Sequence, residues 1–264
     1  MTGKLYVVGI GPGDPELLTL KAVRILREVP CIFVPKGREE GSSLALSIVQ
    51  KTLTLDGKEI IEAYFPMMKT APHSLRSRKH SQTLAAGPGP LPRGDRASAQ
   101  ANDLDSKWDE IVERVLGRIE KGIDVAFITI GDPGIYSTFF YLYDRLLERK
   151  PSLAIEIVPG ISSINAAAAR AGLSLGLGNE RIAILPANYL DGLQETLEKF
   201  DTVVLMKVNK VFDTVRDVLV KTNLADRAVF VSRTGMEDER VYHDVRKVTK
   251  EELNYFSLMI VRKR

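Results

Sequence analysis

The sequence has little cysteine, little histidine and no long apolar run, and each shortage excludes a class of protein. Its single cysteine, Cys31, rules out a disulfide within the chain, and the apolar run around it predicts a buried thiol. The three histidines lack the spacing of metal ligands, so we expect no bound metal. No stretch approaches the roughly 18 apolar residues of a membrane span. We therefore expect a cytoplasmic protein that does not enter a membrane.

The charge balance is too even to indicate nucleic acid as a partner. With 37 basic and 34 acidic residues, the formal net charge is +3, which does not oppose an acidic small molecule. The chain has 264 residues, of which 44% are hydrophobic, so it is long enough for two domains of ordinary size. We place these domains at residues 1–160 and 161–264.

The first thirty residues predict a strand, a glycine-rich turn and a helix. Residues 5–10 form a short apolar run that ends among glycines, and apolar residues at helical spacing follow. A dinucleotide fingerprint would require a third glycine where Asp14 stands, and no P-loop lysine follows. The turn therefore suits a ligand that tolerates an acid, or no ligand at all, with Asp14 and Glu16 capping the helix.

Strands and helices continue to alternate along the chain, as in an α/β protein. Strands are predicted at residues 32–35, 58–65, 124–130, 153–158, 182–185, 202–208, 228–232, 240–245 and 255–262, and helices at 43–53, 106–119, 139–149, 162–171, 190–200 and 211–221. The alternation predicts a mainly parallel sheet in the first domain. Three closing strands without helices between them predict a mixed sheet in the second.

One stretch, residues 69–104, breaks this alternation. It contains four prolines, several glycines and serines, and hardly any apolar periodicity. Such a composition buries too little apolar surface to offset the entropy of ordering. We predict a disordered insertion here, with the helix resuming at Ser106 as its N-cap.

Three loops are predicted to meet at one edge of the first sheet. Residues 9–14, 131–138 and 159–163 each follow a strand of that sheet, and ligands of open parallel sheets bind beyond the carboxyl ends of the strands. These loops offer glycine backbone, an acid, hydroxyls and apolar side chains, but no lysine cradle for phosphate. That chemistry suits a neutral or cationic ligand with an adenosine-like part.

The sequence of these loops resembles the tetrapyrrole methylases. The matching segments are Val8-Gly-Ile-Gly-Pro-Gly-Asp-Pro-Glu-Leu-Leu-Thr-Leu-Lys21, Gly131-Asp-Pro-Gly-Ile-Tyr-Ser-Thr138, Val158-Pro-Gly-Ile-Ser-Ser163 and Val203-Val-Leu-Met-Lys207. Within the family, Tyr64-Phe-Pro-Met67 and the Tyr-Ser-Thr segment are similar to the C-20 methyltransferases. The resemblance implies S-adenosylmethionine as methyl donor, precorrin-2 or its cobalt-bearing counterpart as acceptor, and a homodimer. The insertion departs from the family pattern and puts one wall of the acceptor trough in doubt.

The resemblance also implies which residues hold the methyl donor in a cleft between the domains. They are Pro12, Gly131, Asp132, Ile135, Tyr136, Ser162, Ser163, Ala187 and Met206. For Asp132 a turn-forming role is the alternative to ligand contact, and for Tyr136 and Met206 it is core packing. Asp14 is the candidate catalytic residue, orienting the macrocycle or accepting a proton, with helix capping as its alternative.

Three other functions stay open on the sequence. The first is methylation of another ring carbon of a corrin or siroheme precursor, because the donor motifs are shared within the family. The second is a nucleotide-binding module without chemistry. The third is a catalytically impaired protein, because of the insertion.

Overall fold

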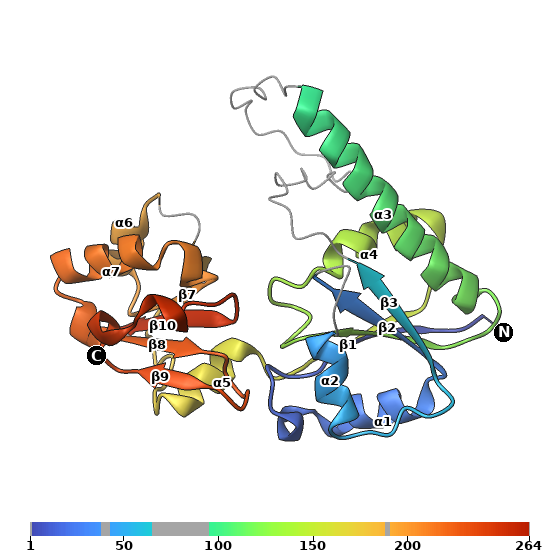
Figure 1. The fold of residues 1–264 in the computed structure, drawn as a ribbon, viewed down its shortest axis with the longest axis horizontal. Helices are drawn as coiled ribbons and strands as arrows, with labels where there is room; N and C mark the ends of the chain where they lie inside the picture. The colour runs from blue at the N-terminus through green and yellow to red at the C-terminus, as the bar shows by residue number, and fades with distance from the viewer. Residues whose placement is uncertain (1, 38–42, 65–94, 188–190, 264) are drawn as a thin grey trace.

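The computed structural model of the chain describes residues 2–37, 43–64, 95–187 and 191–263. It contains two five-stranded sheets, one in each half of the chain (Figure 1). None of the helices in these residues is long and apolar enough to cross a membrane. The boundary at residue 160 stays a prediction; strands up to Val158 belong to the first sheet, and strands from Ile182 belong to the second.

The first sheet is parallel throughout and has the strand order β3-β2-β4-β1-β5. Its elements are β1 (Leu5–Gly9), α1 (Leu20–Glu28), β2 (Cys31–Lys36), α2 (Leu44–Gln50), β3 (Glu59–Tyr64), α3 (Asp95–Ile119), β4 (Val125–Thr129), α4 (Phe140–Arg149) and β5 (Ile155–Val158). Strand β1 lies between β4 and β5. After β1 the chain builds β2, β3 and β4 on one side of it, and only then adds β5 on its other side. This reversal is the topological switch point at which open α/β sheets bind ligands.

Helices cover both faces of the first sheet (Figure 1). Helices α1 and α2 pack on one face, where Ile25 and Val49 join Val8 of β1 in one apolar cluster. Helices α3 and α4 pack on the other face, where Trp108 and Leu142 join a second cluster. The parallel strands are apolar on both sides because both sides are covered.

The second sheet is mixed, with the strand order β6-β7-β10-β8-β9. Its elements are α5 (Ser163–Arg170), β6 (Ile182–Pro186), α6 (Leu193–Lys199), β7 (Thr202–Met206), α7 (Phe212–Lys221), β8 (Ala228–Ser232), β9 (Arg240–Tyr242) and β10 (Ser257–Arg262). Strands β6 and β7 are parallel, whereas β10 runs antiparallel to β7 and β8. Helix α5 packs on one face and helices α6 and α7 on the other. The predicted class, an α/β chain with one parallel and one mixed sheet, is confirmed.

Two predicted helix starts are wrong. Residues Pro15–Leu17 form a separate 3-10 turn, and α1 begins only at Leu20 with Thr19 as its N-cap. The third helix begins at Asp95 rather than near Ser106. Its first residues are rich in alanine, and this intrinsic propensity extends a helix that the Trp108 stripe already nucleates. The predicted disorder of residues 69–104 is therefore wrong for residues 95–104, which belong to this helix, and residues 69–94 lie outside the described residues.

The single cysteine is buried, as predicted. Cys31 begins β2 and is fully enclosed. Burial raises the pKa of its thiol to about 12, and the neighbouring Glu59 carboxylate adds to the rise. Because the thiolate is the reactive form, this side chain serves packing rather than chemistry.

A carboxylate on the edge strand generates a prediction about acid stability. Glu156 of β5 pairs with Lys21 of α1 at 2.6 Å and with Lys4 beside β1. These hydrogen bonds, that of Lys21 first, hold the pKa of Glu156 at about 2, below the usual value of about 4.3. A depressed carboxyl pKa stabilises the fold above about pH 4.3, and that stabilisation is lost as the pH falls towards 2.

We therefore expect Glu156→Gln to lower the free energy of unfolding at pH 7 and to approach wild type in stability between pH 4.3 and 2. Urea unfolding at a series of pH values measures this difference. A difference that does not change with pH would contradict the assignment.

Candidate functional site

The three glycine-containing loops meet at the carboxyl ends of β4, β1 and β5. The amide of Gly131 donates a hydrogen bond of 2.8 Å to the carbonyl oxygen of Gly11, which joins the first loop to the second. The amide of Gly160, in the third loop, bonds to the Asp132 carboxylate at 2.9 Å. The predicted convergence of residues 9–14, 131–138 and 159–163 is thus confirmed.

Glycines are required here because the three backbones touch. A Cβ atom on Gly9 would lie 2.7 Å from both the carbonyl oxygen of Gly131 and the amide nitrogen of Gly160. A Cβ atom on Gly160 would lie 2.3 Å from the same Gly131 oxygen. No side chain fits at these distances. The glycines therefore serve contact between loops and not the phosphate cradle of a nucleotide fold.

Asp132 holds two of the loops together with its two carboxylate oxygens. Oδ1 accepts from the Gly134 amide at 2.7 Å, which is an Asx turn, and Oδ2 accepts from the Gly160 amide at 2.9 Å. Of the two roles considered for this residue, the structure contains the turn-forming one. Contact with a ligand stays a prediction.

Asp14 caps the 3-10 turn rather than the long helix. Its Oδ1 accepts from the Glu16 amide at 2.9 Å, whereas Thr19 caps α1 through the Ala22 amide. The expectation that Asp14 and Glu16 occupy the positive end of that helix is wrong, because the helix begins later. Asp14 does act as a cap, but of the 3-10 turn at Pro15–Leu17. Its side chain is half-buried.

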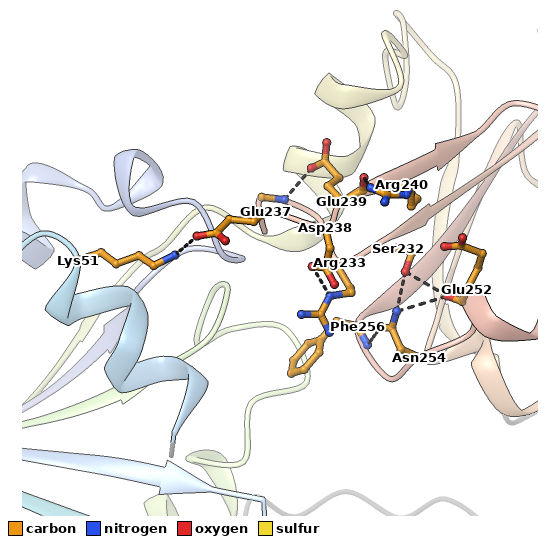
Figure 2. A network of polar contacts seen from close by, with 11 residues as sticks. Lys51, Ser232, Arg233, Glu237, Asp238, Glu239, Arg240, Glu252, Asn254 and Phe256 are labelled. Atoms are coloured by element: carbon orange, nitrogen blue, oxygen red, sulfur yellow. Dashed lines mark hydrogen bonds and ion pairs between the residues drawn. The ribbon is translucent and has the colours of Figure 1, made fainter. Parts of the chain in front are cut away.

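A loop of the second domain closes on the first glycine loop (Figure 2). It runs from Arg233 to Glu239 between β8 and β9, and we call it the β8–β9 loop. A Cβ atom on Gly13 would lie 2.7 Å from Met236 Cγ, and a Cβ atom on Gly235 would lie 2.8 Å from the Asp14 amide nitrogen. The two domains therefore meet backbone to backbone beside Asp14.

Sequence reasoning missed this loop. Its only local signal is Gly235, which follows Thr234 in an unremarkable polar run. Thr234 is 4% exposed, and its hydroxyl has no hydrogen-bond partner among the described residues. A buried hydroxyl without a partner is costly, so a group that bonded to it would stabilise this loop.

Tyr136 joins the domains a second time. Its ring lies 5.3 Å from the ammonium of Lys207, and its hydroxyl donates to the carbonyl oxygen of Ile184 at 3.4 Å. Both Tyr136 and Lys207 have left-handed backbones, with φ of 52° and 59°, which is rare for residues with a side chain. The core alternative for Tyr136 is wrong, because the residue is 46% exposed. Burial of its hydroxyl nevertheless raises its pKa.

The remaining candidate residues surround these contacts. Ser162 is buried and caps α5 through the Asn165 amide at 3.2 Å, and Ser163 begins that helix. Ala187 donates to the Met206 carbonyl oxygen at 2.7 Å, one residue before Lys207. Pro12 is buried inside the first loop, and Ile135 packs against the apolar cluster around α5 and β10.

These residues therefore form one neighbourhood at the junction of the domains. Tyr136 connects the first-domain loops to the ends of β6 and β7, where Ala187 and Met206 lie. Their role in holding a ligand stays a prediction. Two surface hollows lie elsewhere, one beside α6 and one near residues 177–180.

Exposed aromatic rings lie beside this neighbourhood. Tyr141 of α4 stacks on Trp108 with ring centroids 5.0 Å apart, and it remains 43% exposed. Burial raises the pKa of the Tyr255 hydroxyl, and Tyr141 adds to the rise. Tyr255 precedes Phe256, whose carbonyl oxygen accepts from the Arg233 amide of the β8–β9 loop at 2.7 Å. Because the Tyr255 ring is itself 45% exposed, flat apolar surface faces solvent on both sides.

Comparison with known proteins gives the class of this chain. A model of the tetrapyrrole (corrin/porphyrin) methylase family matches residues 4–248. The chain therefore belongs to the tetrapyrrole methylases. The match extends over the first sheet, over the second sheet up to β9, and over all the loops described above.

Particular relatives are similar over nearly the full length. The cobalt-precorrin-2 C(20)-methyltransferase of Salmonella typhimurium is 31% identical, over 100% of this chain and 98% of that protein. A probable cobalt-precorrin-2 C(20)-methyltransferase of Methanocaldococcus jannaschii is 35% identical, over 98% of this chain and 96% of that protein. The uroporphyrin-III C-methyltransferase of Thermus thermophilus, complexed with S-adenosylhomocysteine, has a TM-score of 0.62 at 20% identity, over 99% of this chain and 98% of that one. This last likeness concerns the fold.

The two hydrogen bonds that the Asp132 carboxylate accepts lead to a prediction about stability. Asp132→Ala leaves the amides of Gly134 and Gly160 without an acceptor, and we expect a loss of about 2 kcal/mol in the free energy of unfolding. Asp132→Asn keeps one acceptor oxygen and is the matched control, with about half that loss. Urea unfolding of the three proteins at pH 7 tests this. Equal stability of Asp132→Ala and wild type would show that the carboxylate does not hold the loops.

Proposed function

We propose that this protein transfers a methyl group from S-adenosylmethionine to C-20 of cobalt-precorrin-2, a step of cobalamin biosynthesis. The observation that carries this proposal is the similarity, across both domains, to two proteins named for that reaction. Both names specify the cobalt-bearing acceptor, which favours it over metal-free precorrin-2. The converging loops supply the local support, because they follow the strands at the switch point of the sheet.

The residues at the domain junction fit the methyl donor. Gly131 has φ of 76°, and a Cβ atom there would meet only the Ser163 amide nitrogen at 3.9 Å, so a ligand has room to approach its backbone. Thr234 offers a buried hydroxyl that still needs a partner. We assign donor binding to this threonine together with the residues named from the family resemblance: Pro12, Gly131, Asp132, Ile135, Tyr136, Ser162, Ser163, Ala187 and Met206.

Methyl transfer requires that these residues align the donor with the acceptor and exclude water from the site. When bound, S-adenosylmethionine supplies an electrophilic methyl group on a positively charged sulfur. Charge disperses during such a transfer, so a strong base is not obligatory and a dry, ordered site supplies most of the acceleration. Backbone carbonyls and hydroxyls suit the positive charge. The nearby ammonium of Lys207 is held over the Tyr136 ring.

The acceptor's place is proposed from the aromatic surfaces. A tetrapyrrole presents broad apolar faces, and the exposed rings of Tyr141 and Tyr255 offer matching surface beside the donor loops. Asp14 lies at the same junction, next to Gly235. In this proposal its carboxylate orients the macrocycle or accepts the proton that the methylated carbon releases.

A homodimer and the cytoplasm are further parts of the proposal. Strands β5 and β6 are outer strands of their sheets among the described residues, and Ile157, Ile182 and Ile184 on them are exposed. An apolar edge of this kind favours cover by a second copy. The lone buried cysteine is typical of a protein of a reducing compartment.

One experiment tests the reaction. The protein is incubated with the methyl donor and either cobalt-precorrin-2 or precorrin-2, and NMR locates the added methyl group. We expect C-20 methylation, faster with cobalt. Methylation at another carbon would assign the chain to a different position, and a protein that binds NAD or ATP but not S-adenosylhomocysteine would be a nucleotide-binding module.

Asp14 generates a separate prediction. Asp14→Asn keeps an oxygen that can accept from the Glu16 amide, so we expect stability within about 0.5 kcal/mol of wild type. The loss of charge and basicity is expected to lower kcat about tenfold or more. Steady-state kinetics and thermal unfolding measure the two effects. Unchanged turnover with normal product would leave Asp14 only its capping role.

A further inference from the structure

The β8–β9 loop is held by one carboxylate, that of Glu239, which accepts a hydrogen bond from within the loop (Figure 2). The Glu239 side chain is only 9% exposed. Its Oε2 accepts from the Gly235 amide at 2.7 Å, and its Oε1 accepts from Nε of Arg170, at the end of α5. The same carboxylate therefore fixes the middle of the loop and ties it to a helix.

The loop needs such a fixation because its backbone is strained at Arg233, which has φ of 55°. Gly235 has φ of 76°, a conformation that glycine adopts freely. At this geometry Gly235 lies against the Asp14 amide, where a Cβ atom would be 2.8 Å from the nitrogen. A small rotation of the loop would therefore change the contact between the two domains.

The other two acids of the loop, Glu237 and Asp238, are far less able to fix its backbone. Glu237 is 88% exposed and pairs with Lys51, itself 52% exposed, at 2.8 Å. Asp238 pairs with Arg233, and both side chains are more than one third exposed. Exposed ion pairs of this kind contribute little, because solvent screens them. Glu239 differs, since it is enclosed and bonds directly to backbone.

We propose that Glu239 is a positioning residue for the methyl-donor site, acting through Gly235 and with Arg170 as its anchor. The inference rests on the proposed function, because it assigns the donor to the junction beside Thr234. Thr234 immediately precedes Gly235 in the chain. The carboxylate that fixes the Gly235 amide therefore also fixes the backbone that carries the Thr234 hydroxyl. Glu239 itself does not touch the donor.

The test compares two substitutions in the same loop. Glu239→Gln keeps the size of the side chain but has one acceptor oxygen for two donors, and Glu237→Gln removes an exposed charge as the matched control. Titration calorimetry with S-adenosylhomocysteine is done well below the melting temperature of each protein. We expect Glu239→Gln to bind S-adenosylhomocysteine about tenfold more weakly than wild type, because one charge-assisted hydrogen bond is lost. Glu237→Gln is expected to bind it within twofold of wild type.

A second variant reports on the coupling. Gly235→Ala forces a Cβ atom against Asp14 directly, so it should weaken binding too, and Glu239→Gln added to it should cost less than tenfold. If Glu239→Gln does not fold, Arg170→Gln takes its place, with an expected weakening of about threefold.

The possible failures are distinct. A lower melting temperature with unchanged affinity in Glu239→Gln would make this carboxylate merely structural and overturn the inference. Equal weakening by Glu237→Gln would overturn it as well. Wild type that does not bind S-adenosylhomocysteine would overturn the proposed function, and this inference with it.

Discussion

Close contact between three backbones is the constraint on which the rest of this structure depends. Gly9 and Gly160 leave no room for side chains against the Gly131 carbonyl oxygen, where the loops that follow β1, β4 and β5 meet. The strand order places these three strands next to one another, and Asp132 bonds the loops where they meet. The architecture of the sheet and the position of the candidate site are therefore consequences of the same packing.

The second domain adds what the loops lack. By themselves they offer backbone, small polar groups and the Tyr136 ring, whereas the second domain contributes an enclosed hydroxyl at Thr234 and Lys207, whose backbone is strained like that of Tyr136. Strained backbones of this kind persist only where surrounding contacts hold them. Here those contacts come from the opposite domain, since Tyr136 contacts Lys207 and Ile184.

Much of this could be predicted from the sequence, because local patterns carry it. Apolar runs ending in glycine located β1 and β4, and the order of strands and helices gave the parallel and mixed sheets. The turn after Asp14 was mistaken for the start of α1, since proline and glutamate suit both kinds of first turn. The β8–β9 loop was missed because its importance lies in contacts with residues more than two hundred positions earlier, which no local pattern contains.

The strand order also has a consequence for synthesis of the chain on the ribosome. Strand β1 is made first, yet both its neighbours, β4 and β5, lie more than a hundred residues later in the sequence. Until they emerge, a nearly continuous apolar strand has neither of its hydrogen-bonding partners. Parallel pairing over such a separation is slow, so we expect the nascent chain to pass through a stage in which this apolar strand is unpaired and prone to aggregation.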